Sequence, residues 1–387
     1  GQVITIDVHA LIGTVWLGVC RNHNLVTIKA RKHWYLRIAA IQSDAMTTQP
    51  NILWICTDQQ RWDTIAALGN PHIRTPHIDR LVAEGVAFTH AFAKARLNDQ
   101  PGVVSDGSFP TVDALPAERA NDSAPERLIS RIFADAGYTC GLAGKQHLSS
   151  CSDGKVEIRH DDGYDRFEWS HHPQPDWPEN AYTQWLAAKG KSWEELYQGP
   201  ATPYIKEGVP AEFHQTTWCA EQACAFAEAN HGRPWFFSFN CFAPHHPFDP
   251  PAEYLQRYDP ADMPLPKYRP GELENKPHYQ KLDHEHAHND PSGYAVADMS
   301  EEDQRQVTAA YYAMCEQIDD AVGTMVAALE QSGQLEETIV IFMSDHGEML
   351  GDHGIYLKGP HFYEAAVRVP LVIRFPQKLR PTMQFEQ

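Results

Sequence analysis

Two apolar runs that each end in an acidic residue constrain the fold of this 387-residue chain more than any other feature. The first, NILWICTD, covers residues 51–58 and ends at Asp58, and the second, ETIVIFMSD, covers residues 337–345 and ends at Asp345. A short apolar run that ends in a polar residue is typical of a buried parallel strand with a functional group at its carboxyl edge. Asp58 and Asp345 are therefore expected at the same edge of a parallel sheet.

Helical and strand patterns alternate along the chain, which predicts a layered α/β/α sandwich with a mostly parallel central sheet. One helix follows the first strand, with Thr75 as N-cap, Pro76 at its first position and Gly85 as its stop. The longest predicted helix begins at Ser300, with Asp303 in capping-box position, and carries an apolar stripe up to Gly333. The other predicted elements are helices at 125–137 and 217–230 and strands at 138–144, 234–242 and 369–376.

The patterns indicate one folded domain over residues 46–376. Residues 1–45 precede the first methionine and show neither periodicity nor motif, so we expect this leader to lie outside the fold. Residues 243–299 are rich in proline, histidine and acids, which favours a long loop beside an active site. Residues 93–125 carry no helix or strand pattern, and residues 377–387 are interpreted as a truncated tail.

The formal net charge of −19 argues against a nucleic-acid or anionic-membrane partner, although clustered cations can still bind a small anion. The eight cysteines are scattered through apolar runs, without the pairs of a zinc site, and are expected to be mostly reduced. No apolar run is long enough to span a bilayer. The run at residues 10–20 has no basic residues before it, so we expect a cytoplasmic location, with a periplasmic or secreted one as the alternative.

The acidic strand ends could form a metal site. Asp58, Asp345 and His346 would meet if both strands lie centrally and parallel. Oxygen ligands with one imidazole suit calcium, manganese or magnesium better than a structural zinc site. The alternative is that both aspartates only cap the turns that follow their strands.

Cationic side chains also follow predicted strands, and there they could converge on a bound anion. These candidates are Lys145 and His147 in GKQHL, His245 in PHHPF, and Lys358 and His361 in LKGPHFYE. The alternative for each is an ordinary surface residue. The histidine-rich segment DHEHAH at 283–288 is interpreted as a solvated loop rather than a metal site, because no helix pattern fixes its geometry.

Five segments in order resemble motifs of the sulfatase family within the alkaline phosphatase superfamily. The long opening segment 50–92, PNILWICTDQQRWDTIAALGNPHIRTPHIDRLVAEGVAFTHAF, is similar to the N-terminal signature of that family. GKQHL and PHHPF resemble its Lys/His and mid-chain His motifs. SDHGEMLGDHG and KGPHFYEAAVRVPLVIRFP resemble its second metal-ligand segment and the strand that follows.

The resemblance implies an alkaline-phosphatase-like sandwich that hydrolyses small sulfate esters with one divalent cation, calcium before manganese. It assigns the metal to Asp58, Gln59, Asp345 and His346. It further implies that Lys145, His147, His245 and Lys358 hold the sulfate and protonate the leaving alcohol. The smaller C-terminal subdomain of the family is expected to be missing.

Two positions depart from the common pattern of the family. Gln59 replaces its second Asp, and His346 replaces the Asn or Gln after its later Asp. Both departures resemble the branch of phosphonate monoester hydrolases and choline sulfatases, so hydrolysis of phosphonate or phosphodiester bonds is the enzymatic alternative.

The nucleophile of the family, a Cys or Ser in a CxPSR type of motif that is oxidised to formylglycine, has no matching residue here. Codons for Gln100 through Pro110 can be chosen so that a reading frame shifted by one nucleotide gives Ser-Arg-Ala-Ser-Phe-Leu-Thr-Gly-Arg-Phe-Pro, as in the family. The hypothesis is therefore that residues 93–125 are translated out of frame and that the chain as written is a poor catalyst. If the segment is truly encoded, the alternative is a non-catalytic protein that binds metal or anions.

Overall fold

The computed structural model describes most of the chain from residue 49 onward. Side chains are described for residues 49–93, 128–147, 156–157, 159, 161–175, 179–287, 293–358 and 360–379. For residues 5–7, 16–20, 25–30, 34–37 and 383–385 only the backbone is described. The segment 93–125 therefore lies, apart from its first residue, outside the described residues.

The centre of the molecule is a sheet with strand order β14-β6-β13-β11-β5-β10-β8-β9. Strand β5 lies between β11 and β10 and is parallel to both, and β8 and β9 continue this parallel arrangement. Only β13 among these strands runs antiparallel to its neighbours, β11 and β6. The strands are β5 (Asn51–Thr57), β6 (Val86–Phe88), β8 (Thr139–Gly144), β9 (Arg166–Trp169), β10 (Trp235–Cys241), β11 (Thr338–Ser344), β13 (Leu371–Arg374) and β14 (Met383–Phe385).

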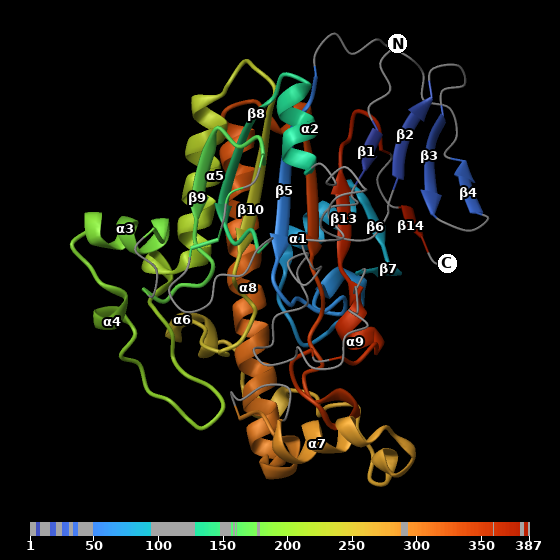
Figure 1. Cartoon of the computed structure of the whole chain (residues 1–387), viewed down its shortest axis with the longest axis vertical. Coiled ribbons are helices and arrows are strands. Elements are labelled where there is room, and N and C mark those ends of the chain that lie inside the picture. The colour runs from blue at the N-terminus through green and yellow to red at the C-terminus, as the bar shows by residue number, and fades with distance from the viewer. Residues whose placement is uncertain are drawn as a thin grey trace, which may run out of the picture.

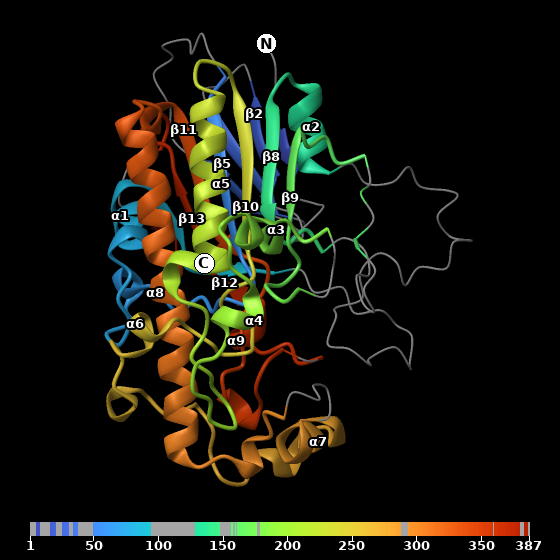
Figure 2. The ribbon, with the colours of Figure 1, turned by 90° about the vertical axis from the view of Figure 1, so that its left-hand side faces the viewer.

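Helices cover both faces of this sheet. Successive side chains of β5 point to opposite faces, so each face packs against different helices. Leu53 and Ile55 belong to the apolar cluster that contains α5 (Gln215–Ala229) and α8 (Glu301–Gln331), which pack side by side (Figures 1 and 2). Ile52 and Trp54 belong to a second cluster with α2 (Ile129–Asp135). The predicted mostly parallel α/β/α sandwich is confirmed.

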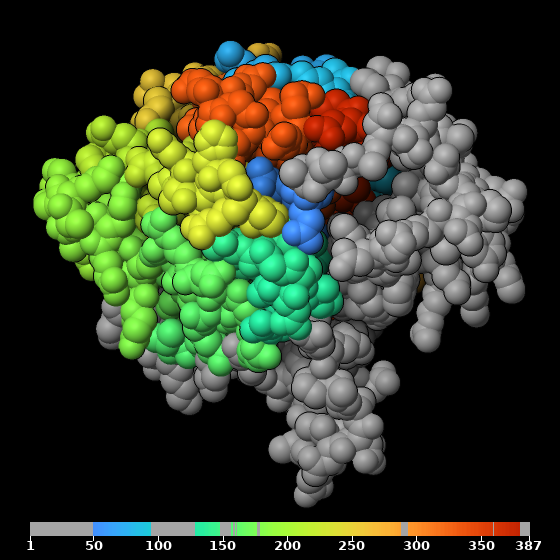
Figure 3. All heavy atoms as spheres, turned by 90° about the horizontal axis from the view of Figure 1, so that it is seen from above, coloured from blue at the N-terminus to red at the C-terminus, as the bar shows by residue number. Residues whose placement is uncertain are grey.

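The parallel strands begin at one end of the sheet and finish at the other. Seen from above, in Figure 3, the blue start of β5 adjoins the yellow, teal and orange segments that connect helices and strands at this end. The parallel strands run away from this end, so their carboxyl ends lie together at the other. Residues that directly follow β5, β8, β10 and β11 are therefore brought to one edge.

The local signals of the predicted helices are confirmed in position, but the Thr75 side chain makes no capping hydrogen bond, and Gly85 is needed for another reason than expected. Helix α8 has the capping box of Ser300 and Asp303. Helix α1 runs over Pro76–Glu84 and ends at Gly85 as predicted. Gly85 is extended rather than left-handed, and a Cβ there would lie 2.5 Å from the carbonyl oxygen of Ile373. A glycine is thus required by the close approach of β13.

Three expectations from the sequence need correction. The region 243–299 is not a plain loop, because it holds α6 (Ala252–Leu255) and α7 (His278–His286). DHEHAH was expected to be a loop, but its first four residues belong to α7, and its last, His288, lies outside the described residues. The tail after residue 376 adds an edge strand, β14, which pairs with β6.

Smaller elements complete the fold. β7 (Ala91–Phe92) and β12 (Arg368–Val369) form an antiparallel pair. Residues expected to be a leader contribute β1 (Thr5–Asp7), β2 (Trp16–Cys20), β3 (Leu25–Ala30) and β4 (Trp34–Arg37), a separate antiparallel sheet. The remaining helices are α3 (Ala181–Ala188), α4 (Trp193–Leu196) and α9 (Glu364–Val367), with 3-10 turns at Ala66–Leu68, Ala211–Phe213, Pro260–Asp262, Glu272–Asn275, Val296–Asp298, Leu335–Glu337 and Asp352–Gly354.

The cysteines with described side chains are all free thiols, four of them buried and two half-buried, as expected. In the described part of the chain, no helix has the length and apolarity that a membrane crossing needs.

Candidate active site

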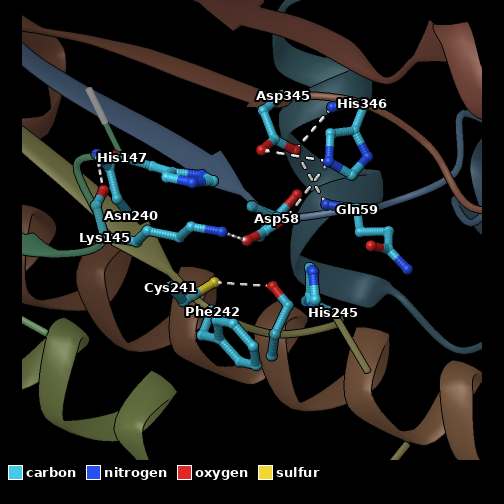
Figure 4. Close-up of polar contacts among 12 residues, drawn as sticks. Asp58, Gln59, Lys145, His147, Asn240, Cys241, Phe242, His245, Asp345 and His346 are labelled. Atoms are coloured by element: carbon cyan, nitrogen blue, oxygen red, sulfur yellow. Dashed lines mark hydrogen bonds and ion pairs between the residues drawn. The ribbon is translucent and has the colours of Figure 1, made fainter. Parts of the chain in front are cut away.

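Polar side chains from four neighbouring strand ends meet at the carboxyl edge of the sheet (Figure 4). Asp58 follows β5, and Asp345 with His346 follows β11, the parallel neighbour of β5. Lys145 follows β8, and His245 follows β10 by a short turn. The topology therefore delivers the residues that the sequence singled out to one place.

Asp58, Asp345 and His346 form a compact group. One possible ligand atom from each lies within 4.8 Å of those of the other two. Nε2 of His346 is 3.7 Å from Oδ1 of Asp58 and 3.7 Å from Oδ2 of Asp345. Asp345 is held by the backbone N–H groups of Gln59 and His346, which donate to its Oδ1 over 3.0 and 2.7 Å.

The electrostatics of this group favour a cation. Oδ1 of Asp58 is buried and has no hydrogen-bond partner among the described residues. Nδ1 of His346 lies 2.9 Å from the carbonyl oxygen of Gly347, and donation there directs the Nε2 lone pair toward both carboxylates. Burial and the charge of Asp58 raise the pKa of Asp345. Two carboxylates and an imidazole nitrogen are a donor set that fits a divalent cation.

Lys145 forms a buried ion pair with Asp58. Its Nζ lies 2.5 Å from Oδ2, and the two side chains are 9% and 4% exposed. Burial alone would raise the pKa of Asp58, but Lys145 and the other nearby cations hold it well below its usual range. Asn240 fixes the backbone of Lys145 through two hydrogen bonds of 2.8 Å, one between main chains and one from its side-chain amide.

Lys358 and His245 contact each other near Asp58. Nζ of Lys358 lies 2.7 Å from Nε2 of His245 and donates to Oε1 of Gln59 over 3.0 Å. Nδ1 of His245 lies 2.7 Å from the carbonyl oxygen of His246, so donation there leaves Nε2 as the acceptor for Lys358. Burial, and then the charge of Lys358, keep the pKa of His245 well below its ordinary value. Burial also lowers the pKa of Lys358.

His147 lies near the same group. Its ring extends toward Asp58 in Figure 4, and it makes an edge contact with His171 at 4.9 Å between ring centroids. Its backbone N–H donates to Glu157 over 2.9 Å. Burial, and then the charge of Lys145, hold the pKa of His147 well below its ordinary value. Burial and nearby positive charge thus disfavour the protonated form of both His147 and His245.

Two residues that the sequence analysis places in the site make hydrogen bonds other than the expected ones. The side-chain amide of Gln59 contacts Lys358 and Glu348 in this arrangement, so its role as a metal ligand stays a prediction. His361, considered for anion binding, is buried and bonded to Asp283 of α7 at 2.6 Å, which makes it a structural residue.

Sequence reasoning missed several residues that hold the site in place. Asn240 follows the pattern of a polar residue near the end of an apolar strand and could have been found that way. Glu348 lies only two residues after His346 in SDHGEML, but its contacts are set by the fold. Tyr311 of α8 donates to the carbonyl oxygen of Gln59 over 2.6 Å and accepts from the N–H of Arg61 at 2.9 Å, and the apolar stripe gave no sign of this role.

The described residues near the site include two thiols, Cys56 and Cys241. Burial raises the pKa of both well above the ordinary value. An activated nucleophilic thiol needs the opposite shift. Neither cysteine therefore fits the nucleophile that the resemblance to sulfatases implies.

Comparison with known proteins agrees with the fold. The sulfatase family model matches residues 50–386. An arylsulfatase of Clostridium perfringens is 29% identical over 346 residues, covering 86% of this chain and 69% of that protein. The multifunctional alkaline phosphatase superfamily protein PehA of Trinickia caryophylli is 29% identical over 377 residues, covering 88% and 71%.

A solved structure shows the same fold. The phosphonate monoester hydrolase of Agrobacterium radiobacter superposes with a TM-score of 0.66 at 24% identity, covering 88% of this chain and 71% of that one. The layered sheet and the polar carboxyl edge thus place the chain in the class of proteins with an alkaline-phosphatase-like fold. Within this class the chain belongs to the sulfatase family, a family of sulfuric ester hydrolases that generally use a divalent metal.

Proposed function

We propose that this protein hydrolyses small sulfate esters at the carboxyl edge of the sheet, with calcium as the divalent cation. The observation that carries the proposal is the buried Oδ1 of Asp58. It lacks a hydrogen-bond partner among the described residues and faces Nε2 of His346. An unsatisfied buried carboxylate oxygen costs free energy unless a bound cation satisfies it.

Asp58, Asp345 and His346 would hold the cation, with Gln59 as the fourth proposed ligand. When bound, calcium would supply positive charge to the sulfate oxygens. The chain itself contributes Lys145, which pairs with Asp58, and Lys358, which donates to Gln59, and both would provide donors for the remaining sulfate oxygens. Both lysines are held by neighbours before a substrate arrives, so they need little reorganisation when it binds.

His245 and His147 are proposed to handle protons. An imidazole that protonates a leaving alcohol must carry a proton at the moment of bond cleavage. Lys358 donates to Nε2 of His245, so a sulfate that draws Lys358 away would let His245 accept a proton and pass it on. His147 lies beside Lys145 and is the second candidate for this task.

Metal titration by calorimetry tests the binding part of this proposal. We expect calcium to bind the wild-type chain, and Asp58→Asn to weaken binding at least about tenfold, because it removes a charged ligand. Asp262→Asn, which changes an exposed carboxylate on a 3-10 turn, is the matched control. Tighter binding of manganese than of calcium would overturn the choice of metal, and an unchanged affinity of the Asp58 variant would overturn the site.

A phosphonate or phosphodiester hydrolase is the second candidate. Gln59 and His346 favour it, since both depart from the common sulfatase pattern, and the phosphonate monoester hydrolase of Agrobacterium radiobacter shares the fold. Aryl esters of sulfate, phosphonate and phosphate with the same leaving group separate the two. A higher kcat/KM for the sulfate ester supports the first candidate, and a higher value for either phosphorus ester supports the second.

The source of the nucleophile is the remaining part of the proposal. We propose that it belongs to the segment 93–125, read in a shifted frame. An independent nucleotide read across codons 90–128 tests this. A restored Cys or Ser before Ser-Arg-Ala-Ser-Phe-Leu-Thr-Gly-Arg supports an ordinary sulfatase. A confirmed sequence favours a protein that binds calcium and sulfate without turnover.

A further inference from the structure

We propose that Glu348 is a positioning residue that fixes the amide of Gln59, so that the amide oxygen faces Lys358 and the active site. This inference rests on the proposed function, because it assigns Lys358 to sulfate binding. It goes further by naming a residue outside the metal and sulfate groups that determines how they are presented.

The amide of Gln59 has a different partner at each end. Its Nε2 donates to Oε2 of Glu348, and its Oε1 accepts from Nζ of Lys358 at 3.0 Å. A carboxylate only accepts and an ammonium only donates, so the two partners permit one orientation of the amide. The Gln59 side chain is fully buried, which removes water as an alternative partner.

Glu348 is itself fixed by backbone groups. Its Oε1 accepts from the N–H groups of Leu350 and Leu357, the first at 2.8 Å and the second at 2.5 Å. Its carbonyl oxygen accepts from Nη1 of Arg61 at 3.0 Å. The carboxylate is fully buried, so Oε2 stays directed at Gln59.

The backbone of Gln59 is equally constrained. It adopts a left-handed φ of 69°, its N–H donates to Asp345, and its carbonyl oxygen accepts from Tyr311. These contacts hold the side chain beside Glu348 and Lys358, and its amide oxygen keeps a second lone pair for a further partner. The result is a hydrogen-bonded series from Glu348 through Gln59 and Lys358 to His245. In such a series each bond orients the next.

Glu348→Gln is the sharpest single test, because it keeps the shape and the acceptor for Leu350 and Leu357. It changes the atom that faces Gln59 from an acceptor to a donor and removes one negative charge, which the double variant below restores. Two NH2 groups then oppose each other, and relief by rotating Gln59 would direct its NH2 group at the ammonium of Lys358. We expect inorganic sulfate, titrated at saturating calcium, to bind about 10–100-fold more weakly.

A compensating double variant separates this role from a general loss of packing. With Gln59→Glu and Glu348→Gln together, the amide donates to the carboxylate at position 59, whose second oxygen still accepts from Lys358. The net charge and the number of side-chain atoms are those of the wild type. We expect sulfate affinity to return to within about threefold of the wild-type value, whereas Gln59→Glu alone, with two carboxylates in contact, stays defective.

Glu337→Gln, at an exposed glutamate of the turn before β11, is the control and should bind sulfate normally. If the wild type binds neither calcium nor sulfate, the proposed function fails and this inference with it. If the wild type binds both and Glu348→Gln binds sulfate equally well, only the inference fails. If Glu348→Gln does not fold, the double variant decides, since a folded double variant without sulfate binding overturns the proposal.

Discussion

Lys145 and Asp58 form a buried ion pair at the carboxyl edge of the sheet, with 2.5 Å between Nζ and Oδ2. They come from two strands, β8 and β5, that are separated by β10. Lys145 therefore reaches across the end of β10 to neutralise an aspartate that also faces His346. Asp58 thus contacts the lysine through Oδ2 and faces the imidazole through Oδ1.

Removal of this lysine tests the importance of the pair. Lys145→Met leaves Asp58 buried without its main counter-charge, and we expect the free energy of unfolding to fall by about 3–5 kcal/mol. Chemical denaturation without divalent cations measures this loss. Lys189→Met, which breaks an exposed pair with Glu221 at 3.8 Å, should have little effect. Equal stabilities of the two variants would show that the buried pair is not needed for folding.

Calcium should stabilise the folded chain through the same aspartates. A ligand that binds only the native state stabilises it by about 2.7 kcal/mol at a concentration 100 times its Kd. We expect chelation to lower the Tm of the wild type and to leave that of Asp345→Asn nearly unchanged, because this variant has lost one ligand. A similar chelator effect on both proteins would place the stabilising ion elsewhere.

His214 should make stability depend on pH. It is the N-cap of α5, where its Nδ1 accepts from the N–H of Thr216, and burial lowers its pKa to about 4. The ordinary value is 6.5, so the unfolded chain binds more protons between these values. The contribution is fully present above pH 6.5 and falls by about 3 kcal/mol as the pH drops to 4.

Urea unfolding of His214→Asn between pH 4 and 7.5 measures this contribution. Asparagine keeps an acceptor for the helix and does not titrate, so the variant should lose less stability on acidification than the wild type. His231→Asn, at an exposed histidine, should retain the pH dependence of the wild type. Parallel curves for the His214 variant and the wild type would contradict the assignment.

Tyr311 should link the long helix to the active-site loop. Tyr311→Phe leaves the carbonyl oxygen of Gln59 and the N–H of Arg61 without their buried partner, and we expect a loss of about 1–3 kcal/mol in unfolding free energy. Tyr312→Phe is the matched control on the same helix. Its hydroxyl accepts from Asn70, whose amide keeps a second bond to Asp63, so its loss should be smaller. A larger loss for Tyr312→Phe would contradict this role.

The fold could be predicted as far as it depends on local patterns. NILWICTD and ETIVIFMSD became β5 and β11 with boundaries within one residue, because an apolar run marks a strand buried on both faces. Helix α7 was missed because HYQKLDHEH has no apolar stripe. It is held by contacts with residues far away in the sequence, including a hydrogen bond between Asp283 and His361. β14 was missed because it is short and pairs with a strand far earlier in the chain.

The sequence predicts which residues meet at the site, but not which hydrogen bonds they form. Asp58, Asp345 and Lys145 follow parallel strands, so topology alone brings them together. The orientation of Gln59 depends on Glu348, a contact between positions nearly three hundred residues apart. No pattern within either segment indicates it.

The last prediction concerns Gly144, which precedes Lys145 and has a left-handed φ of 106°. A Cβ at this position would lie 1.9 Å from the carbonyl oxygen of Asn240, a contact that requires the backbone of β8 or β10 to move. Gly137 has a similar φ of 90° but no atom within 4 Å of an added Cβ. Gly137→Ala therefore measures the cost of the backbone conformation alone, about 1–2 kcal/mol.

We expect Gly144→Ala to lose clearly more stability than Gly137→Ala in denaturant unfolding, and to weaken calcium binding as well. The reason is that a shift of Asn240 moves Lys145. Both the N–H and the carbonyl oxygen of Lys145 are hydrogen-bonded to Asn240. Gly137 lies at the opposite end of β8, so its variant should bind calcium normally. Equal losses in the two variants would mean that the close approach of β8 and β10 does not position the lysine.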